Sequence, residues 1–572
     1  MTFFTSLYGG KSWLSTIIVL LCFFSSASLL PAQTSANADV PGPGEISLTA
    51  NTNAPATNSP PVISVEMPAL PPAPAPPVST PAATEAAPAS PLALPIFNVP
   101  GAILAALMTL ASLGGFLLYQ CGLTRAKNCG HTSTLLLVGV LFGLTGYWIG
   151  GFAVQMGGVG DAHAALTQPL QSAEKGALNH ELGPVLWGHH WGVMGSSGFF
   201  LATDAGPAPD DSARNGIAVL FLMQAALLAI ALAAALGAAL ERAKILSMAF
   251  CAYLIGVLVY PLLANWVWGG GWLAEMGHEF GLGHGFVDLA GAGVVHQTAG
   301  TLALVIAIAL GPRHGRFGRN RHSPAIPGHH VPFILLGSIV LLISWMAANA
   351  FANASLIGEP GSESSATSAG LAAINTLLAA TGGLVISFVQ AAWQKRRTEP
   401  ARLCRGLLGG AVASCSCAGL IDPWAAFIIG GVAGLLVQAA MNQLERKRID
   451  DPVGAAAVHG VGGAWGVLAM GLFANGTAGN GLNGVDTSVR GLFFGGGWHQ
   501  LASQIIGCAT GFAVVYLLGY ACVNLVQKIL GNRADLADET TGLDMPELGV
   551  LGYQGDAEPE GPADGSKVAP EK

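Results

Sequence analysis

Two stretches of the chain repeat one pattern and decide how it folds: Asp288-Leu-Ala-Gly-Ala-Gly-Val-Val-His296-Gln-Thr-Ala-Gly300 and Asp451-Pro-Val-Gly-Ala-Ala-Ala-Val-His459-Gly-Val-Gly-Gly463. Both read D-x-x-G-A-x-x-V-H-x-x-x-G. A carboxylate at the start of a helix is stabilised by unpaired backbone N–H groups and by the helix dipole. Each stretch therefore predicts a helix that begins at an aspartate and carries a histidine among apolar side chains.

The composition around these stretches is typical of a membrane protein. Of 572 residues, 52% are hydrophobic and 10% are charged, and the mean hydropathy is +0.55. Soluble proteins carry about 25% charged residues. The 78 glycines suit helices that approach closely in lipid. This composition excludes a large soluble enzyme, and the net charge of −8 offers no basic surface for nucleic acid.

We predict an all-α membrane protein with eleven transmembrane helices, because apolar stretches long enough to cross a hydrocarbon core of roughly 30 Å recur along the chain. The predicted spans are 97–119, 132–157, 216–238, 246–268, 287–311, 330–350, 370–394, 403–418, 423–440, 453–475 and 503–527.

Positive charges support this order of spans. Lys and Arg fall almost entirely into alternate connections, which hold Arg125, Lys127, Arg242, Lys244, Arg313, Arg316, Arg319, Arg321, Lys395, Arg396, Arg397, Arg402, Arg405, Arg446, Lys447, Arg448, Lys528 and Arg533. The other connections hold Lys175, Arg214 and Arg490. Because positively charged loops stay cytoplasmic, we predict a multi-pass protein of the inner (plasma) membrane with its N-terminus outside and its C-terminus in the cytoplasm.

The two histidine stretches fall in the fifth and tenth predicted spans. Two halves of five spans have opposite orientations, so the pattern predicts a 5+5 inverted repeat followed by a final helix. Such repeats place their binding site near the midplane, between the halves. We expect His296 and His459 to lie close together, with Asp288 starting its helix on the outer side and its repeat partner Asp451 on the inner side. A single buried histidine would suit a core residue, but a symmetry-related pair at membrane depth indicates a pathway.

The remaining chain divides by composition. Residues 1–38 predict a signal peptide, with Lys11 before an apolar core and small residues near Ala38; an extra N-terminal span is the alternative. Residues 39–95 predict a disordered, Pro/Ala-rich periplasmic linker. Residues 96–530 form the predicted membrane domain, and residues 531–572 a cytoplasmic C-terminal tail.

Asp288 to His296 and Asp451 to Trp465 resemble the twin-histidine motifs of the Amt/Mep/Rh family of ammonium transporters, in its bacterial Amt branch. Further similar segments, in the family's order, are Leu123-Thr-Arg125-Ala-Lys127-Asn128, Glu241-Arg242, Trp266-Val-Trp268-Gly-Gly-Gly271, and the C-terminal regulatory motif of Gly542, Leu543 and Asp544 with Tyr553. The resemblance covers residues 97 to 553.

This resemblance implies transport of ammonium or ammonia, with methylammonium as an analogue, through a hydrophobic pore lined by His296 and His459. It implies that ammonium loses its proton before passage. Trp268 is the expected aromatic wall of an outer recruitment site, and Asp288 its electrostatic and structural support. The resemblance further implies a homotrimer in the lipid bilayer and a PII-type regulatory protein docking on the cytoplasmic face.

The outer gate departs from the family pattern. Alignment places Leu227 at one phenylalanine position, Ala348 at the position of the second gating phenylalanine, and Ala352 where the family often has a recruiting serine. Nine extra residues, roughly 278–286, separate the Trp268 segment from Asp288. These departures leave two alternatives open: an ammonium sensor with little flux, or an Rh-like channel for ammonia or carbon dioxide.

Several residues also have plainer interpretations. Trp268 suits an interfacial aromatic belt, and Asp288 alone suits a helix cap. His180, His189, His190, His278 and His284 suit solvated loops better than an external metal site. The nine cysteines show neither a disulfide framework nor a zinc pattern, and Cys121 and Cys129 suit buried packing or cytoplasmic thiols. We therefore expect no metal and no cofactor. We also expect no enzymatic activity, because no nucleotide loop or nucleophile elbow is present.

Overall fold

A computed structural model describes residues 99–159, 178, 180–202, 211–318, 326–357 and 363–553. All of them belong to one compact unit, Ser90–Lys572. The predicted signal peptide and linker lie outside the described residues, as does the tail beyond Tyr553.

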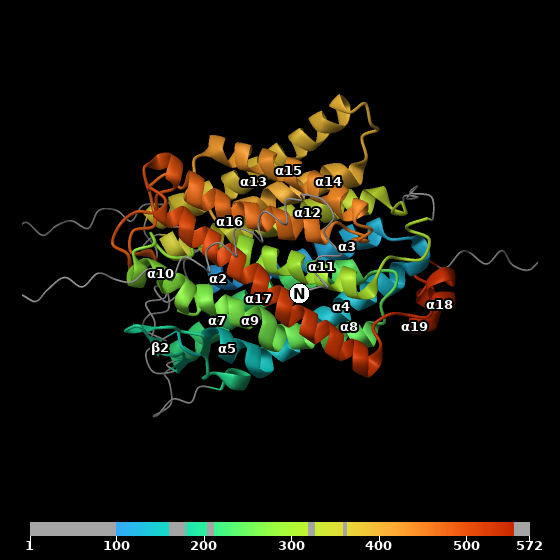
Figure 1. The fold of residues 1–572 in the computed structure, drawn as a ribbon, viewed down its shortest axis with the longest axis horizontal. Coiled ribbons are helices and arrows are strands. Elements are labelled where there is room, and N and C mark those ends of the chain that lie inside the picture. Colours follow the sequence, from blue (N-terminus) through green and yellow to red (C-terminus); the bar gives the residue numbers. More distant parts are fainter. Residues whose placement is uncertain are drawn as a thin grey trace, which may run out of the picture. The chain divides into compact units, whose positions relative to one another are not determined.

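Helices make up nearly all of the described structure (Figure 1). The α-helices are α2 Val99–Leu110, α3 Ser112–Leu123, α4 Cys129–Gly146, α5 Phe152–Met156, α7 Asp211–Leu236, α8 Ile245–Leu254, α9 Tyr260–Trp268, α10 Trp272–Phe280, α11 Thr298–Leu310, α12 Val331–Ile357, α13 Glu363–Trp393, α14 Pro400–Ser414, α15 Pro423–Arg446, α16 Gly462–Phe473, α17 His499–Leu530, α18 Leu536–Thr541 and α19 Asp544–Leu548.

Shorter turns continue or connect these helices. Four are π-helical: η3 Tyr147–Gly151, η7 Ile255–Val259, η8 Ala292–Gln297 and η9 Ala456–Val461. The 3₁₀ turns are η2 Ala126–Asn128, η5 Phe199–Leu201, η6 Gly237–Ala239, η10 Leu482–Gly484 and η11 Leu492–Phe494. Single π turns inside α-helices are frequent at functional sites, and η8 and η9 are the two that contain the motif histidines.

Two small antiparallel sheets follow α5. Strand β1 (Glu181–Leu182) pairs with β4 (Met194–Gly195), so that Glu181 faces Gly195. Between them, β2 (Val185–Leu186) pairs with β3 (His189–His190), with Leu186 opposite His189. The pairs are nested hairpins, and in Figure 1 they lie at the end of the bundle that also holds α10.

Ten helical segments among the described residues are long and apolar enough to cross a membrane. They are Pro100–Leu123, Ala126–Met156, Gly216–Ala239, Ile245–Phe280, Ala292–Leu310, Val331–Ala354, Ser368–Trp393, Pro423–Arg446, Ala456–Phe473 and His499–Leu530. The predicted span 403–418 corresponds to α14, whose 15 residues are too short for that criterion. The all-α membrane fold is confirmed, whereas the count of eleven spans stays a prediction.

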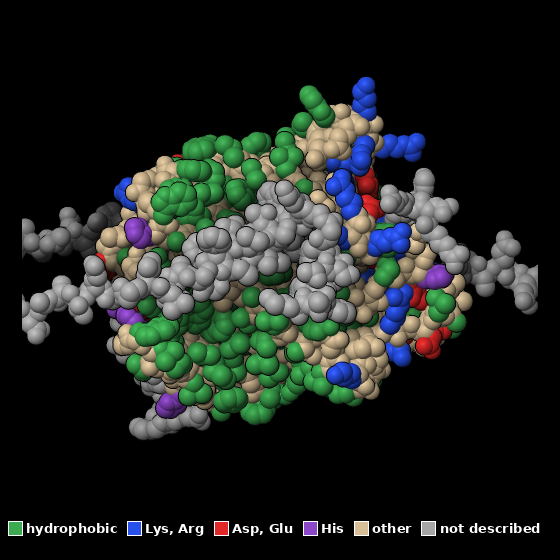
Figure 2. All heavy atoms as spheres, viewed as in Figure 1, with side chains coloured by type: hydrophobic (Ala, Val, Ile, Leu, Met, Phe, Trp, Pro, Cys, Tyr) green, Lys and Arg blue, Asp and Glu red, His purple; other side chains and the backbone are tan. Residues whose placement is uncertain are grey.

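The surface agrees with a membrane setting. Large apolar side chains such as Leu104, Leu141, Ile339 and Leu517 are at least half exposed, which a bilayer would tolerate and water would not. Figure 2 shows hydrophobic side chains over much of the visible face, above and below the grey atoms, and Lys and Arg gathered toward the end that carries α18 and α19.

One prediction about the cysteines was wrong. Cys121 and Cys129 form a disulfide, with their Cα atoms 5.5 Å apart. They lie at the end of α3 and the start of α4, which a tight turn brings together. Their spacing of eight residues could not reveal this, because it depends on where each helix ends. The other described cysteines are free thiols.

Candidate functional site

The first motif aspartate binds the start of its own helix. The Asp288 carboxylate accepts hydrogen bonds from the backbone N–H groups of Gly291 (3.2 Å), Gly293 (2.9 Å) and Val294 (2.8 Å). Its side chain is fully buried, so these bonds replace lost hydration. The carboxylate is therefore occupied by the protein's own backbone, as a helix start requires.

The second motif aspartate does the same. The Asp451 carboxylate accepts from the N–H groups of Gly454 (3.1 Å), Ala455 (3.0 Å) and Ala456 (2.8 Å). The two helix starts are therefore built alike.

The glycine three residues after each aspartate is required by the conformation of the backbone. Gly291 has φ +97° and Gly454 has φ +83°, the left-handed region that side chains disfavour. This turn folds the chain back so that the aspartate can reach the next N–H groups. The D-x-x-G part of the motif is thus a geometric requirement of the helix start.

The last glycine of each motif permits close crossing of the two halves. A methyl group at Gly300 would collide with the backbone of Gly460, and one at Gly463 would collide with the backbone of Ala292 and Gln297. Accordingly, α11 packs on η9 and α16 packs on η8. Small residues let helix backbones touch in this way, and the crossing places the π turns side by side.

The two histidines meet at this crossing. Nδ1 of His296 lies 3.0 Å from Nδ1 of His459, and the rings are nearly parallel, with centroids 5.1 Å apart. Both side chains are buried. The Trp345 ring lies edge-on to both, at 4.9 Å and 5.7 Å between centroids, and the Phe116 ring lies 5.9 Å from that of His459.

This geometry limits the protonation of the pair. One Nδ1 must donate and the other must accept, so two neutral rings leave one Nε2 as donor and the other as acceptor. The pair can therefore offer both kinds of partner to a small polar molecule. A small cavity adjoins His459 on the side of Gly454, lined also by Phe116, Tyr119 and Gln120.

The two predicted recruitment residues are directly joined. The Trp268 indole N–H donates to the backbone carbonyl of Asp288 at 2.7 Å. The far edge of the indole lies beside Gly291. Trp268 is 6% exposed, so its indole is almost wholly packed inside the protein.

The predicted outer-gate positions lie on two helices. Leu227 is buried in α7, and Ala348 and Ala352 lie on α12, three and seven residues after Trp345. Residues at this spacing share one helix face. Small side chains therefore follow Trp345 along that face, where a phenylalanine would fill more space. In the extra segment 278–286, Phe286 is buried against Gly293 and Gly507.

At the opposite end, buried charges tie the first turn to the end of α7. The Glu241 carboxylate accepts from the Arg125 side chain (2.8 Å), from Asn128 (2.9 Å) and from Arg313. Burial raises the pKa of Glu241, but the cationic Arg313 and Arg125 outweigh it and bring that pKa to about 2. The carboxylate is held in its charged form.

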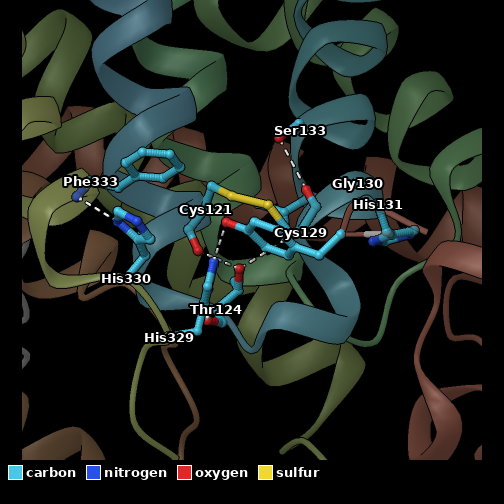
Figure 3. Close-up of a disulfide and its surroundings, with 12 residues drawn as sticks. Cys121, Thr124, Cys129, Gly130, His131, Ser133, His329, His330 and Phe333 are labelled. Carbon is cyan, nitrogen blue, oxygen red and sulfur yellow. Dashed lines mark hydrogen bonds between the residues drawn. A yellow bond between two sulfur atoms is a disulfide. The ribbon is translucent and has the colours of Figure 1, made fainter. Parts of the chain in front are cut away.

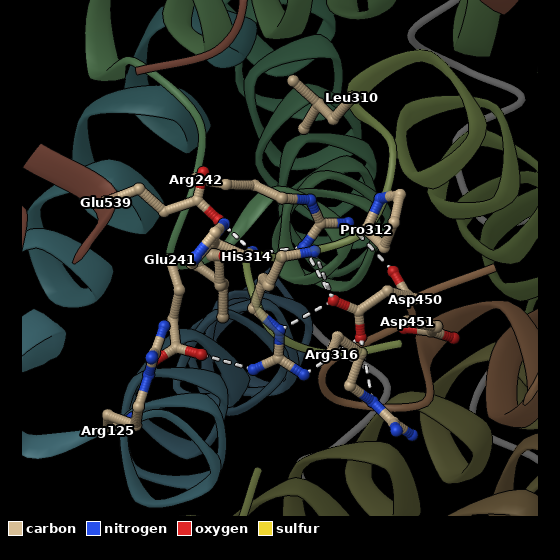
Figure 4. A network of polar contacts seen from close by, with 12 residues as sticks. Arg125, Glu241, Arg242, Leu310, Pro312, His314, Arg316, Asp450, Asp451 and Glu539 are labelled. Atoms are coloured by element: carbon tan, nitrogen blue, oxygen red, sulfur yellow. Dashed lines mark hydrogen bonds and ion pairs between the residues drawn. The ribbon is translucent and has the colours of Figure 1, made fainter. Parts of the chain in front are cut away.

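The same arginine reaches the second repeat. Arg313 donates to Asp450 from its backbone N–H, Nε and Nη2 at 2.8–3.0 Å, and Arg242 donates to the Asp450 carbonyl at 2.9 Å (Figure 4). Burial raises the pKa of Asp450, but hydrogen bonds from Arg313 lower it to about 2. Four connections that carry positive charge in the sequence thus meet at one end of the bundle, next to Asp451.

The residues of the C-terminal motif all contact the first turn or its neighbour. Asp544 accepts from Gly130 (3.2 Å) and His131 (2.8 Å) at the start of α4, and the N–H of Leu543 donates to Asn128 at 2.9 Å. The remaining two motif residues lie close by: a side chain at Gly542 would meet Lys127, and the Tyr553 hydroxyl lies 2.8 Å from Nε2 of His329.

Two described groups have ligand atoms close enough to hold a metal: Cys121, Cys129 and His329, and Glu275, His278 and Glu279. In the second group, Glu279 also contacts His189. The sulfur atoms of the first group are engaged in the disulfide. The expectation that the chain binds no metal stays a prediction.

Trp345, Phe116 and Asp450 belong to the site but were not among the predicted residues. No local sequence pattern marks Trp345 as a neighbour of the histidines. The acidic pair Asp450-Asp451 was visible in the sequence, as was the Glu241-Arg242 segment that belongs to the same charge network.

The chain is similar to proteins of known family. Residues 101–553 match the model of the Ammonium Transporter Family. The ammonium transporter Amt2 of Archaeoglobus fulgidus is 30% identical over 458 residues, which cover 79% of this chain and 87% of that protein. Amt1 of the same organism is 32% identical over 346 residues, covering 60% of this chain and 80% of its own.

Solved structures share the fold. One described as a sensor Amt protein is 26% identical with a TM-score of 0.64, covering 79% of this chain and 98% of its own. The structure of Mep2 from Candida albicans, 23% identical with a TM-score of 0.60, covers 77% of this chain and 86% of its own.

Proposed function

Since the chain belongs to the ammonium transporter family, we propose that it moves ammonium or ammonia across a membrane through a hydrophobic pore lined by His296 and His459. Ammonium transport or sensing follows from the family. The histidine-lined path is the finer part of the proposal.

One observation carries this path: the 3.0 Å contact between the two buried histidine rings at the crossing of η8 and η9. Burying two hydrogen-bonding rings among apolar helices is costly, and ionisable side chains at membrane depth usually mark a pathway or a functional site. A pair that offers both a donor and an acceptor suits a small neutral molecule such as ammonia.

A cation would have to lose its proton before it entered. Moving an ion into a medium of low dielectric has an idealised cost on the order of 20 kcal/mol, which uncharged ammonia avoids. An indole face attracts cations by up to about 2 kcal/mol, which suits Trp268 for recruitment. Its link to Asp288 would hold that indole above the helix start.

The proposal also includes the orientation of the protein, its membrane, its oligomeric state and its regulatory partner. We place the end that carries Glu241, Asp450 and the C-terminal motif in the cytoplasm and the α10 end outside, in the inner (plasma) membrane. The homotrimer and the PII-type partner follow from family membership alone and extend the proposal to the cytoplasmic face.

Substitution of the histidines tests the pore. In proteoliposomes on a solid-supported membrane, we expect His296→Ala and His459→Ala to lose most of the ammonium-induced current or methylammonium uptake. The matched control is His190→Ala, which removes an exposed hairpin histidine and should behave as wild type. Wild-type uptake by both pore variants, each folded by size-exclusion chromatography, would exclude the histidine path.

A second candidate function, ammonium sensing with little flux, is favoured by one pair of observations. The first observation is the similarity to a solved structure described as a sensor Amt protein. The second is that small residues, Ala348 and Ala352, occupy the predicted outer-gate positions of this chain. Ammonium binding measured by calorimetry, without current in the same preparation, would favour sensing. Robust current that saturates with ammonium would favour transport.

A further inference from the structure

The disulfide closes the turn on which the C-terminal motif lies. Cys121 is in the last turn of α3 and Cys129 is the first residue of α4, so the bond fastens two helix ends and the loop between them (Figure 3). Cys121 is buried and Cys129 is half-buried. The second sulfur is therefore the one that a small thiol can approach.

The tail lies directly over Cys129. A methyl group at Gly552 would stand 3.3 Å from Cβ of Cys129, and the Gly552 N–H donates to Asp544 at 2.9 Å. That same carboxylate binds Gly130 and His131, the residues that follow Cys129. The position of α4's first residues thus sets the position of the tail.

His329 makes a second link between the closed turn and the tail. Its backbone N–H donates to the carbonyl of Thr124 at 3.0 Å, and its ring Nδ1 lies 2.8 Å from the same oxygen. Its Nε2 lies 2.8 Å from the Tyr553 hydroxyl. Thr124 lies within the loop that the disulfide closes. A change in the conformation of that loop would therefore move His329 and alter its contact with Tyr553.

We propose that Cys121 and Cys129 are a reversible thiol–disulfide site that controls docking of tail residues 542–553. The proposal rests on the cytoplasmic placement given under the proposed function. Disulfides in that compartment are usually transient and redox-sensing rather than structural. In the oxidised form the turn is closed and the tail is held; in the reduced form the turn gains conformational freedom and the tail binds more weakly.

The chemistry is thiol–disulfide exchange with a small disulfide such as oxidised glutathione. The Cys129 thiolate attacks it, forms a mixed disulfide and releases one glutathione thiolate. The Cys121 thiolate then attacks the Cys129 sulfur and releases the second. The two protein thiols lose two protons and two electrons, and one glutathione disulfide becomes two glutathione thiols.

The site is also placed to affect the path near the histidines. Tyr119 and Gln120, which precede Cys121 on α3, line the cavity beside His459. A change in the end of α3 therefore acts on side chains that border that cavity.

A redox titration of the full-length protein in nanodiscs tests the proposal. After equilibration with glutathione mixtures, differential alkylation and mass spectrometry report the disulfide, and hydrogen exchange reports the amides of 124–131 and 542–553. We expect a single transition in the disulfide, with tail amides exchanging about five-fold faster or more in the reduced form, the low end of typical coupling between sites.

Three variants sharpen this test. In Cys129→Ser, which cannot form the disulfide, the amides of 542–553 should exchange fast at every glutathione ratio. Tyr553→Phe should speed exchange of the tail while leaving disulfide formation unchanged. Cys522→Ser, which removes a buried free thiol in α17, should behave as wild type. Because the wild-type titration needs no variant, a variant that fails to fold does not weaken the result.

Three results would overturn the proposal. One is a pair that stays reduced at all ratios. Another is stoichiometric zinc held by Cys121, Cys129 and His329 that blocks alkylation, which would make this a metal site. The third is a disulfide that forms without changing tail exchange. None of these measurements uses transport. Evidence against the histidine-lined path would therefore not affect the test of the thiol–disulfide site, and evidence against the thiol–disulfide site would not affect the test of the histidine-lined path.

Discussion

The segment from Asp288 to Gly300 and the segment from Asp451 to Gly463 have the same backbone design and opposite surroundings. Each has a carboxylate that accepts three N–H groups, a left-handed glycine three residues later and a π turn that holds a histidine. Around the first lie indole and phenyl rings, such as Trp268 and Phe286. Beside the second lies the charge network of Asp450 and Arg313.

This difference separates what the repeat builds from what each end of the molecule adds. The shared features bring the histidines together, so symmetric substitutions should have matching effects. The surroundings differ, so their responses to acid and to added side-chain volume should diverge.

The largest effect is expected where the repeats cross. Gly300→Leu and Gly463→Leu would drive a side chain into the opposing backbone, which cannot yield as a side chain can. We expect each to cost more than about 4 kcal/mol and to abolish folded protein in size-exclusion chromatography. Gly114→Leu, at a position with open space around it, is the control. A normal yield of either crossing variant would contradict the proposed close packing.

Removal of the motif carboxylates should be next in size. Asp288→Ala and Asp451→Ala each leave three buried N–H groups without an acceptor, at about 1–3 kcal/mol for each group left unpaired. Asparagine at either position keeps one acceptor oxygen and should cost less. Thermal unfolding in nanodiscs measures both. If only one repeat were sensitive, the two helix starts would not be equivalent.

Acid should weaken the charge network that lies beside the second repeat. Glu241 has a folded-state pKa of about 2 against an ordinary value of 4.5, so its contribution is present above pH 4.5 and is lost as the pH falls toward 2. The shift corresponds to about 3 kcal/mol. The thermal midpoint of wild type should fall across that window, and Glu241→Gln should be less stable at neutral pH with a weaker acid dependence. An unchanged acid dependence in the variant would contradict this role for Glu241.

The smallest effects should come from the left-handed glycines. Alanine at Gly291 or Gly454 meets the same kind of backbone strain, but at Gly291 it also meets the Val295 side chain at 2.4 Å, and at Gly454 the flexible Arg405 side chain at 3.0 Å. Gly531, also left-handed with φ +69° but open, gives the strain alone, about 1–2 kcal/mol. We expect destabilisation in the order Gly291, Gly454, Gly531 by thermal unfolding. Equal destabilisation at all three positions would mean that contacts with neighbouring side chains add nothing to the cost of backbone strain.

Much of the membrane fold was determined by the sequence itself. The length of the apolar spans and the alternation of positive charge both depend on local composition. Each side chain has its own preference for lipid or water, so these features can be read along one segment. The repeated motif likewise predicted that His296 and His459 would meet, since equivalent positions in related halves share a depth.

Only the tertiary structure decided what surrounds that pair. Trp345 reaches both rings from α12, Arg313 joins Glu241 to Asp450, and Cys121 bonds to Cys129 instead of remaining a thiol. These contacts depend on the angle and offset at which helices cross and on the residue at which each ends. Side-chain packing between distant segments sets those quantities, and no periodicity along one segment records them.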